Sequence, residues 1–172
     1  MSKFRHRGLA VLTSAAVASF LASFSILHAQ SGAGPGPEFR GSTVWNLADG
    51  VITLTGTPSR DTPLYTRIAL ADSVSSLEFR APKGARADLY VQGRYGVALN
   101  GTGDWQSVAI RFRAPRMDAG FNKIANALML EVRVGDDVRR NVVFDKPSEG
   151  ARWDAEDFRG PIVIYVSEGA FA

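Results

Sequence analysis

Alternation of apolar and polar residues with a period of two is the feature that most constrains the fold of this 172-residue chain. From Ser42 onward, turn residues interrupt the alternation about every 8 to 12 positions. A β-strand points successive side chains to opposite faces, so this pattern predicts strands with one buried face. Many short strands cannot all bury an apolar face in one open sheet. We therefore expect an all-β fold, an antiparallel β-sandwich.

Particular segments carry this prediction, and none after Ser42 has a helical period. In 106–113, the apolar side chains of alternate residues share one face, and in 128–134 the alternation places Met129, Glu131 and Arg133 outward. Gly93 predicts a bulge between two strands, Asp49-Gly50 predicts a hairpin turn, and 118–127 predicts a loop. The expected strands are 51–55, 64–68, 76–80, 89–92, 95–99, 106–113, 128–134, 141–144 and 162–166.

Residues 1–29 have the features of a secretory signal. Three basic residues precede an uncharged apolar run over 8–29, and Leu27-His28-Ala29 offers a cleavage site before Gln30. The run is also long enough to span a bilayer, which takes about 20 residues. The alternative is therefore a retained anchor helix in the inner membrane. In both cases we expect the rest of the chain to be periplasmic or extracellular.

The expected organisation is one domain behind a leader. A linker rich in Gly and Pro covers 30–41, and the sandwich covers 42–172. Of the 20 basic residues three lie in the leader, which leaves 17 against 17 acidic residues, so the domain lacks the positive charge of a nucleic-acid binder.

Composition also excludes several kinds of catalytic and metal site. The chain has no Cys, and both histidines, His6 and His28, lie in the leader. A Ser-His-Asp triad and a thiolate or imidazole metal site are therefore excluded from the domain, and we expect no metal and no cofactor. The acidic runs 136–137 and 154–157 are more typical of solvated turns than of Ca²⁺ sites.

Three neighbouring polar residues are candidates for ligand binding. Gln92, Arg94 and Tyr95 could line a concave sheet face, where the first two hydrogen-bond a sugar and Tyr95 stacks on it. The alternative is a structural role at the irregularity around Gly93.

A row of arginines forms a second candidate. Arg111, Arg113, Arg116 and Arg133 occupy outward strand positions and could receive a carboxylate or phosphate. The alternative is a set of exposed ion pairs across the sheet with acids such as Glu78 or Glu131, each of which contributes little to stability.

The tryptophans divide between core and surface. Trp105 precedes the best-defined strand, so we expect it to pack in the core. Trp153 lies in the acidic and aromatic segment 152–158, which predicts an interaction loop or a lid; a Trp that merely packs on the surface is the alternative.

Two segments, RADLYVQGRY (86–95) and DWQSVAIRFRAPRMD (104–118), resemble the 3-keto-disaccharide hydrolase family, which is related to concanavalin A-like lectins and glucanases. The resemblance implies a jelly-roll sandwich with a sugar-sized groove on one concave face. Polar family positions are replaced here: Gly96 and Val97 follow Tyr95 in place of acidic and polar residues. Tyr165, Val166, Ser167 and Glu168 stand where the family has a Gln-Asp-His-Gly type cluster.

The depleted groove favours binding over catalysis. Glu168 is a weak catalytic candidate, and Tyr165 joins the ligand-binding candidates. We expect a non-catalytic accessory or binding subunit of a periplasmic or membrane-associated assembly, with a carbohydrate or protein partner in the cell envelope. The alternatives are an active keto-glycoside hydrolase and a lectin-like sugar-binding domain.

Overall fold

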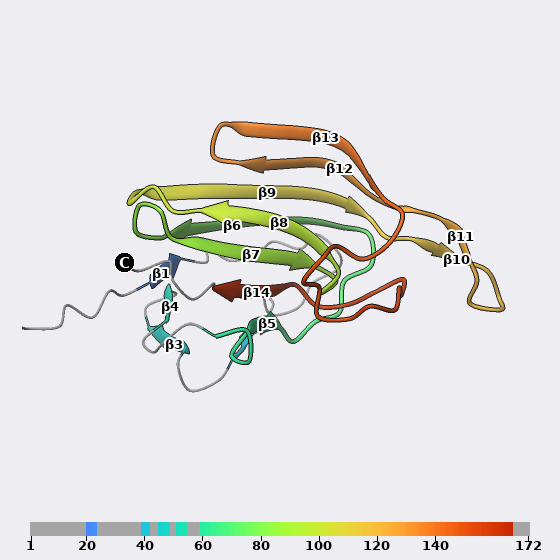
Figure 1. Cartoon of the computed structure of the whole chain (residues 1–172), viewed down its shortest axis with the longest axis horizontal. Coiled ribbons are helices and arrows are strands. Elements are labelled where there is room, and N and C mark those ends of the chain that lie inside the picture. Colours follow the sequence, from blue (N-terminus) through green and yellow to red (C-terminus); the bar gives the residue numbers. More distant parts are fainter. Residues whose placement is uncertain (1–19, 24–38, 42–44, 49–50, 55–58, 167–172) are drawn as a thin grey trace, which may run out of the picture.

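Every regular element in the part of the chain that the structure describes is a β-strand, as the alternation predicts. The computed structural model describes residues 20–23, 39–41, 45–48, 51–54 and 59–166. The strands form two antiparallel sheets that face each other, together with a small hairpin that projects from one end (Figure 1). The chain is therefore an all-β, two-sheet sandwich.

The larger sheet has seven strands in the order β13-β12-β9-β6-β1-β4-β3. They are β1 (Phe20–Ser23), β3 (Trp45–Ala48), β4 (Val51–Leu54), β6 (Ser73–Arg80), β9 (Trp105–Arg113), β12 (Ala127–Val134) and β13 (Asp137–Phe144). The smaller sheet has the order β2-β5-β14-β7-β8. Its strands are β2 (Phe39–Arg40), β5 (Leu64–Thr66), β7 (Arg86–Val91), β8 (Tyr95–Asn100) and β14 (Val163–Val166). The projecting hairpin consists of β10 (Arg116–Met117) and β11 (Lys123–Ala125).

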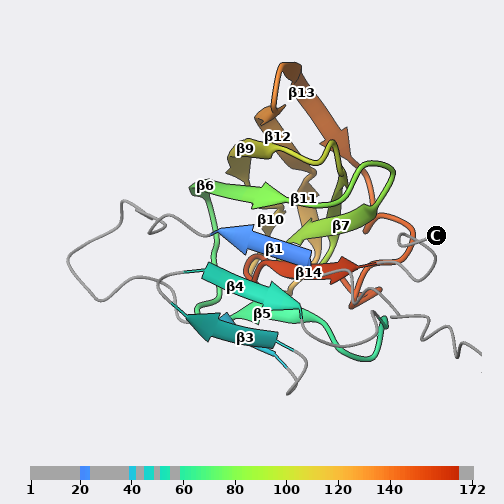
Figure 2. The ribbon, with the colours of Figure 1, turned by 90° about the vertical axis from the view of Figure 1, so that its left-hand side faces the viewer.

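The core lies between the two sheets, whose strands can be followed in Figure 2. On the larger sheet β6 and β9 pair along their full shared length, so their inward side chains stand opposite one another. They meet the inward side chains of β7, β8 and β14 in one buried apolar cluster. It includes Leu77, Phe79, Val108, Ile110, Phe112, Leu89, Leu99 and Ile164. Alternate apolar residues of 76–80 and of 106–113 thus face the core, as the period of two predicts.

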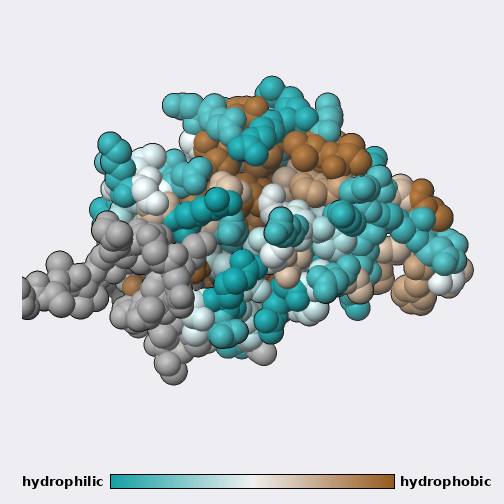
Figure 3. Space-filling model, viewed as in Figure 1, coloured by the Kyte–Doolittle hydropathy of each residue, from teal (hydrophilic) through white to brown (hydrophobic). Residues whose placement is uncertain are grey.

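A bulge in β12 corrects one predicted orientation. Met129 is buried, although strict alternation places it outward with Glu131. The pairing of β12 with β9 shifts register between these two residues, so the intervening Leu130 is an extra residue. One extra residue moves the side chains before it to the other face. Leu130 is left exposed, and Figure 3 shows apolar surface gathered over β12 and β13.

The predicted bulge at Gly93 is a turn. Val91 pairs directly with Tyr95, so residues 92–94 connect β7 to β8 as a hairpin. Gln92 and Gly93 both have left-handed backbone, with φ of 56° and 67°. Gly adopts this conformation without strain. The hairpin turn predicted at Asp49-Gly50 lies outside the described residues. The residues on either side of it, Ala48 and Val51, pair with each other, which agrees with the prediction.

Most of the leader and of the linker lies outside the described residues. The four leader residues that are described form β1, which pairs with β4 and meets β6 at Leu21 and Arg80. These four are strand, whereas a signal or anchor predicts helix. Among the described residues no helix is long and apolar enough to cross a membrane. Residues 118–127, expected as a loop, include the strand β11.

Replacing Phe79 with Ala should destabilise the fold strongly. Its ring is 2% exposed, and removing a buried Phe leaves a cavity that costs about 3 to 5 kcal/mol. Urea unfolding would measure the loss. Val74→Ala on the outward face of the same strand, where Val74 is 59% exposed, is the matched control and should change stability by about 0.5 kcal/mol or less. Equal losses in the two variants would contradict the assigned core face.

Candidate ligand-binding groove

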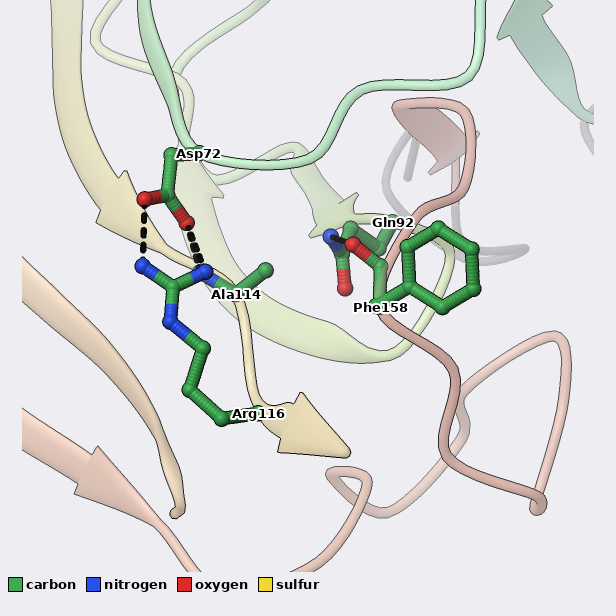
Figure 4. Close-up of polar contacts among 5 residues, drawn as sticks. All are labelled: Asp72, Gln92, Ala114, Arg116 and Phe158. Atoms are coloured by element: carbon green, nitrogen blue, oxygen red, sulfur yellow. Dashed lines mark hydrogen bonds and ion pairs between the residues drawn. The ribbon is translucent and has the colours of Figure 1, made fainter. Parts of the chain in front are cut away.

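The turn between β7 and β8 holds a distant loop, residues 152–160, against the smaller sheet. The side-chain amide of Gln92 is fully buried and donates to the carbonyl oxygens of Leu70 and Phe158, at 3.0 and 3.1 Å (Figure 4). Buried polar groups must find partners within the protein. The amide of Gln92 therefore ties the end of this loop to the turn.

Arg94 makes the same connection with a charged group. Its buried guanidinium donates from Nε to the carbonyl of Ala155 at 2.5 Å, and from Nη1 to the carbonyls of Gln92 at 3.0 Å and Arg159 at 3.4 Å. The backbone N–H of Arg152 donates to the carbonyl of Gly93 at 2.8 Å. The start, middle and end of the loop are thus bonded to the turn or to its Arg94 side chain.

Trp153 lies on the turn at its glycine. A Cβ atom on Gly93 would stand 2.2 Å from the indole ring, so only Gly permits this packing. The guanidinium of Arg94 lies 5.3 Å from the ring centroid, within the range of a cation–π contact. One side of the indole is therefore fixed by the protein, while the side chain remains 40% exposed.

A groove opens between Trp153 and β5, on the outer face of the smaller sheet. Tyr65 of β5 pairs with Val163 of β14, and both point away from the core that Leu64 and Ile164 help to form. The volume of the groove is about 450 Å³, within the range of small-molecule sites. It is lined by Pro63, Tyr65, Thr66, Arg67, Ala69, Arg152, Trp153, Pro161 and Val163. Such a site can stack a flat ligand on its rings and hydrogen-bond it through its guanidinium groups.

The structure places Gln92, Arg94 and Tyr95 beneath this region rather than on its surface. The Tyr95 ring is fully buried between Phe112 and Phe144, with centroid distances of 5.3 and 5.2 Å. Its hydroxyl donates to Glu156 Oε1 at 3.1 Å, and Lys123 forms an ion pair with the same carboxylate at 2.5 Å. None of the three predicted residues lines the groove, so their contribution to it is support.

Tyr165 lies on the same outer face, but it is covered. It packs edge-to-face on Tyr90 with ring centroids 5.8 Å apart, and the guanidinium of Arg60 lies 4.7 Å above its ring. The hydroxyl of Tyr90 donates to the carbonyl of Glu149 at 3.0 Å, and Arg60 donates to the carbonyl of Gly150. Tyr165 is therefore buried and not among the lining residues.

The predicted row of arginines does not form one cluster: Arg111, Arg113 and Arg133 lie on the larger sheet, and Arg116 lies in β10 of the projecting hairpin. Arg116 forms a bidentate pair with Asp72, with distances of 3.0 and 2.6 Å (Figure 4), and this hydrogen bonding lowers the pKa of the Asp72 carboxyl. Glu131 contacts Arg140 at 2.9 Å and Arg133 at 3.8 Å. Arg111 and Arg113 occupy outward positions of β9, the central strand between β6 and β12. The row faces away from the groove.

The expected core position of Trp105 is wrong. Trp105 is 43% exposed at the start of β9, with the guanidinium of Arg80 5.2 Å from its ring centroid. The candidate Glu168 lies outside the described residues. Among the described residues, no three metal-ligating side chains lie close enough together to hold a metal ion, and this holds for the acidic runs 136–137 and 154–157 as well.

The sequence analysis did not identify two residues that line the groove together with Trp153, namely Tyr65 and Arg152. Tyr65 is a large aromatic residue at an outward position of a short strand, which was an available signal. Arg152 gave no signal, because its place depends on the contact of its backbone with Gly93, 59 positions earlier.

No protein-family model matches the chain, and no curated protein matches its sequence. Among solved structures, the fold is similar to that of a protein from Parabacteroides distasonis described as a putative glycosyl hydrolase. The TM-score is 0.60 at 14% sequence identity, over 95% of this chain and 87% of that one. This similarity shows the two-sheet sandwich fold.

Replacing Tyr95 with Phe should change how stability depends on pH. Burial, with a further contribution from Glu156, raises the pKa of the Tyr95 hydroxyl above its ordinary value near 10. The folded protein therefore holds this proton after the unfolded chain has lost it, so stability is complete below about pH 10 and falls above it. Tyr95→Phe should lose about 1 kcal/mol at pH 8, from the missing hydrogen bond to Glu156, and should decline less between pH 8 and pH 11 than the parent. Urea unfolding at the two pH values measures this; parallel declines would contradict it.

Proposed function

We propose that the chain is an exported, non-catalytic β-sandwich that binds carbohydrate, of the jelly-roll type found in the 3-keto-disaccharide hydrolase family. One observation carries the proposal: two partly exposed aromatic rings, Tyr65 and Trp153, border a groove that no carboxylate of the described residues lines. The sugar ring stacks on the aromatic rings, and the polar groups of the groove orient it.

Aromatic residues suit this role because they combine a large apolar face with a polar edge. A pyranose ring has an apolar C–H face of similar size. Trp153 is held in place before any ligand arrives, by Gly93 below it and by Arg94 beside it. A fixed side chain loses little conformational entropy on binding, which favours affinity.

The lining residues favour binding rather than cleavage. Hydrolysis of a glycosidic bond ordinarily needs two carboxyl groups about 5 to 10 Å apart across the bond. None of the nine described lining residues is Asp or Glu. The carboxylates of Asp72, Glu131 and Glu156 are each engaged by a basic side chain elsewhere.

The sequence and the structural neighbour support the remaining parts of the proposal. The signal-like leader supports export to the periplasm or cell surface, with anchoring through residues 8–29 as the alternative. The neighbour from Parabacteroides distasonis supports a carbohydrate as the ligand, by its description as a glycosyl hydrolase. A binding domain of this kind serves as an accessory subunit in a cell-envelope assembly.

Trp153→Ala tests the binding site directly. Loss of a stacked indole should weaken binding of the best ligand from an oligosaccharide panel by about tenfold or more, measured by titration calorimetry. Trp105→Ala is the matched control, because Trp105 is exposed to a similar extent on the other sheet. Equal affinities of Trp153→Ala and the parent would reject the groove as the binding site.

A second candidate is hydrolysis of keto-glycosides, which the description of the structural neighbour favours. Glu168 is then the residue to test. Glu168→Gln should abolish turnover of a 3-keto-disaccharide and leave the melting temperature unchanged. No turnover by the parent chain would instead support the non-catalytic proposal, while turnover at the rate of an active glycosidase would overturn it.

A further inference from the structure

The side chains that line the groove supply hydrogen-bond donors and almost no acceptors. A guanidinium and an indole N–H can only donate, which describes Arg67, Arg152 and Trp153. The hydroxyl of Thr66 is already used, since it donates to the carbonyl of Ile68 at 2.9 Å and accepts from the N–H of Ile162 at 3.0 Å. The hydroxyl of Tyr65 is the remaining side-chain acceptor among the described lining residues.

This inventory fits an acidic sugar better than a neutral one. Each hydroxyl of a neutral sugar donates as well as accepts, so a site for neutral sugars needs acceptors such as carboxylates or amides. An ionised carboxylate on the ligand only accepts. A groove rich in donors can therefore satisfy the carboxylate of a uronate. The hydroxyl group that a neutral sugar carries in its place also has a proton to donate, and the hydroxyl of Tyr65 is the one side-chain acceptor left for it among the described lining residues.

Arg152 is the residue placed to meet that carboxylate. Its backbone N–H bonds to Gly93, so its position follows from the same turn that supports Trp153. Arg152 is exposed, and no ion pair joins its guanidinium to a carboxylate of the described residues. Asp154, the nearest acidic residue in the sequence, is exposed and is not among the lining residues. Arg67 also lines the groove, but it already takes part in another interaction.

We propose that the groove binds a uronate, a sugar unit that carries a carboxylate, and that Arg152 recognises this group. The planar guanidinium receives the carboxylate through two parallel hydrogen bonds, while the pyranose ring stacks on the aromatic border of the groove. The inference rests on the proposed carbohydrate binding and adds the chemical class of the ligand.

The test compares each uronate disaccharide of a panel with its own methyl ester, by titration calorimetry on the full chain. The ester keeps the sugar ring and removes the charge. The free acid should bind about tenfold more tightly than the ester, because hydrogen bonds to a charged group are the stronger ones. Arg152→Gln should abolish this preference, because the acid loses much more affinity than the ester when the guanidinium is removed. Arg139→Gln, on β13 of the other sheet, is the control and should retain the preference.

The outcomes separate this inference from the function on which it rests. Equal binding of acid and ester would overturn the uronate assignment, while binding that Trp153→Ala weakens would still support carbohydrate binding. A preference for the acid that survives in Arg152→Gln would overturn the role of Arg152. Failure of both acids and esters, together with failure of neutral oligosaccharides, would overturn both proposals.

Discussion

The hydrogen bonding of the buried Arg94 guanidinium is the interaction on which the outer face of the smaller sheet depends. Its Nε and Nη1 atoms donate to backbone carbonyls of the turn and of the loop 152–160. A charged group that is buried without partners costs several kcal/mol of stability. Separating the loop from the turn would leave the guanidinium of Arg94 in that state, so it is energetically unfavourable. Trp153, which the loop carries, is held on Gly93 by the same contacts. The wall of the groove is therefore as well fixed as the hairpin beneath it.

The two sheets divide the chemistry of the surface between them. On the outer face of the larger sheet and its edge, Glu131 and Asp72 neutralise neighbouring arginines in exposed ion pairs, which contribute little individually to stability. The outer face of the smaller sheet carries aromatic rings, of which Tyr90 and Tyr165 are covered and Tyr65 is accessible. An aromatic border with basic groups, and no carboxylate among the described lining residues, supports the proposal of ligand binding, because hydrolysis of a glycosidic bond ordinarily needs two carboxyl groups.

Sequence reasoning succeeded wherever the backbone is regular. The period of two follows from the pleat, so the inward residues of β6 and β9 were predictable one by one. It failed at irregularities. The bulge at Leu130 turned Met129 inward, and Gly93 proved to be part of a hairpin. Trp105 shares the outward, exposed face of β9 with Ser107 and Arg111, so its exposure follows the alternation that the core prediction overlooked. Gln92, Arg94 and Tyr95 were candidates because they are polar residues where the alternation is interrupted. In the structure their side chains point into the protein and hydrogen-bond the loop 152–160. That loop lies about 60 positions later in the sequence, so the local pattern could not predict the contact.

The sequence alone determined the class of fold and the chemistry that the domain lacks. Alternation is a local property, and the absence of cysteine from the chain and of histidine after residue 28 requires no structure to establish. Only the tertiary structure decided where a groove forms. The groove lies between Tyr65 and Trp153, and Trp153 packs on Gly93. Any two of these three residues are 28 to 88 positions apart in the chain. A site made by such distant residues exists only after the two strands and the loop have packed together, because each side chain is placed by contacts that its own neighbours in sequence do not supply.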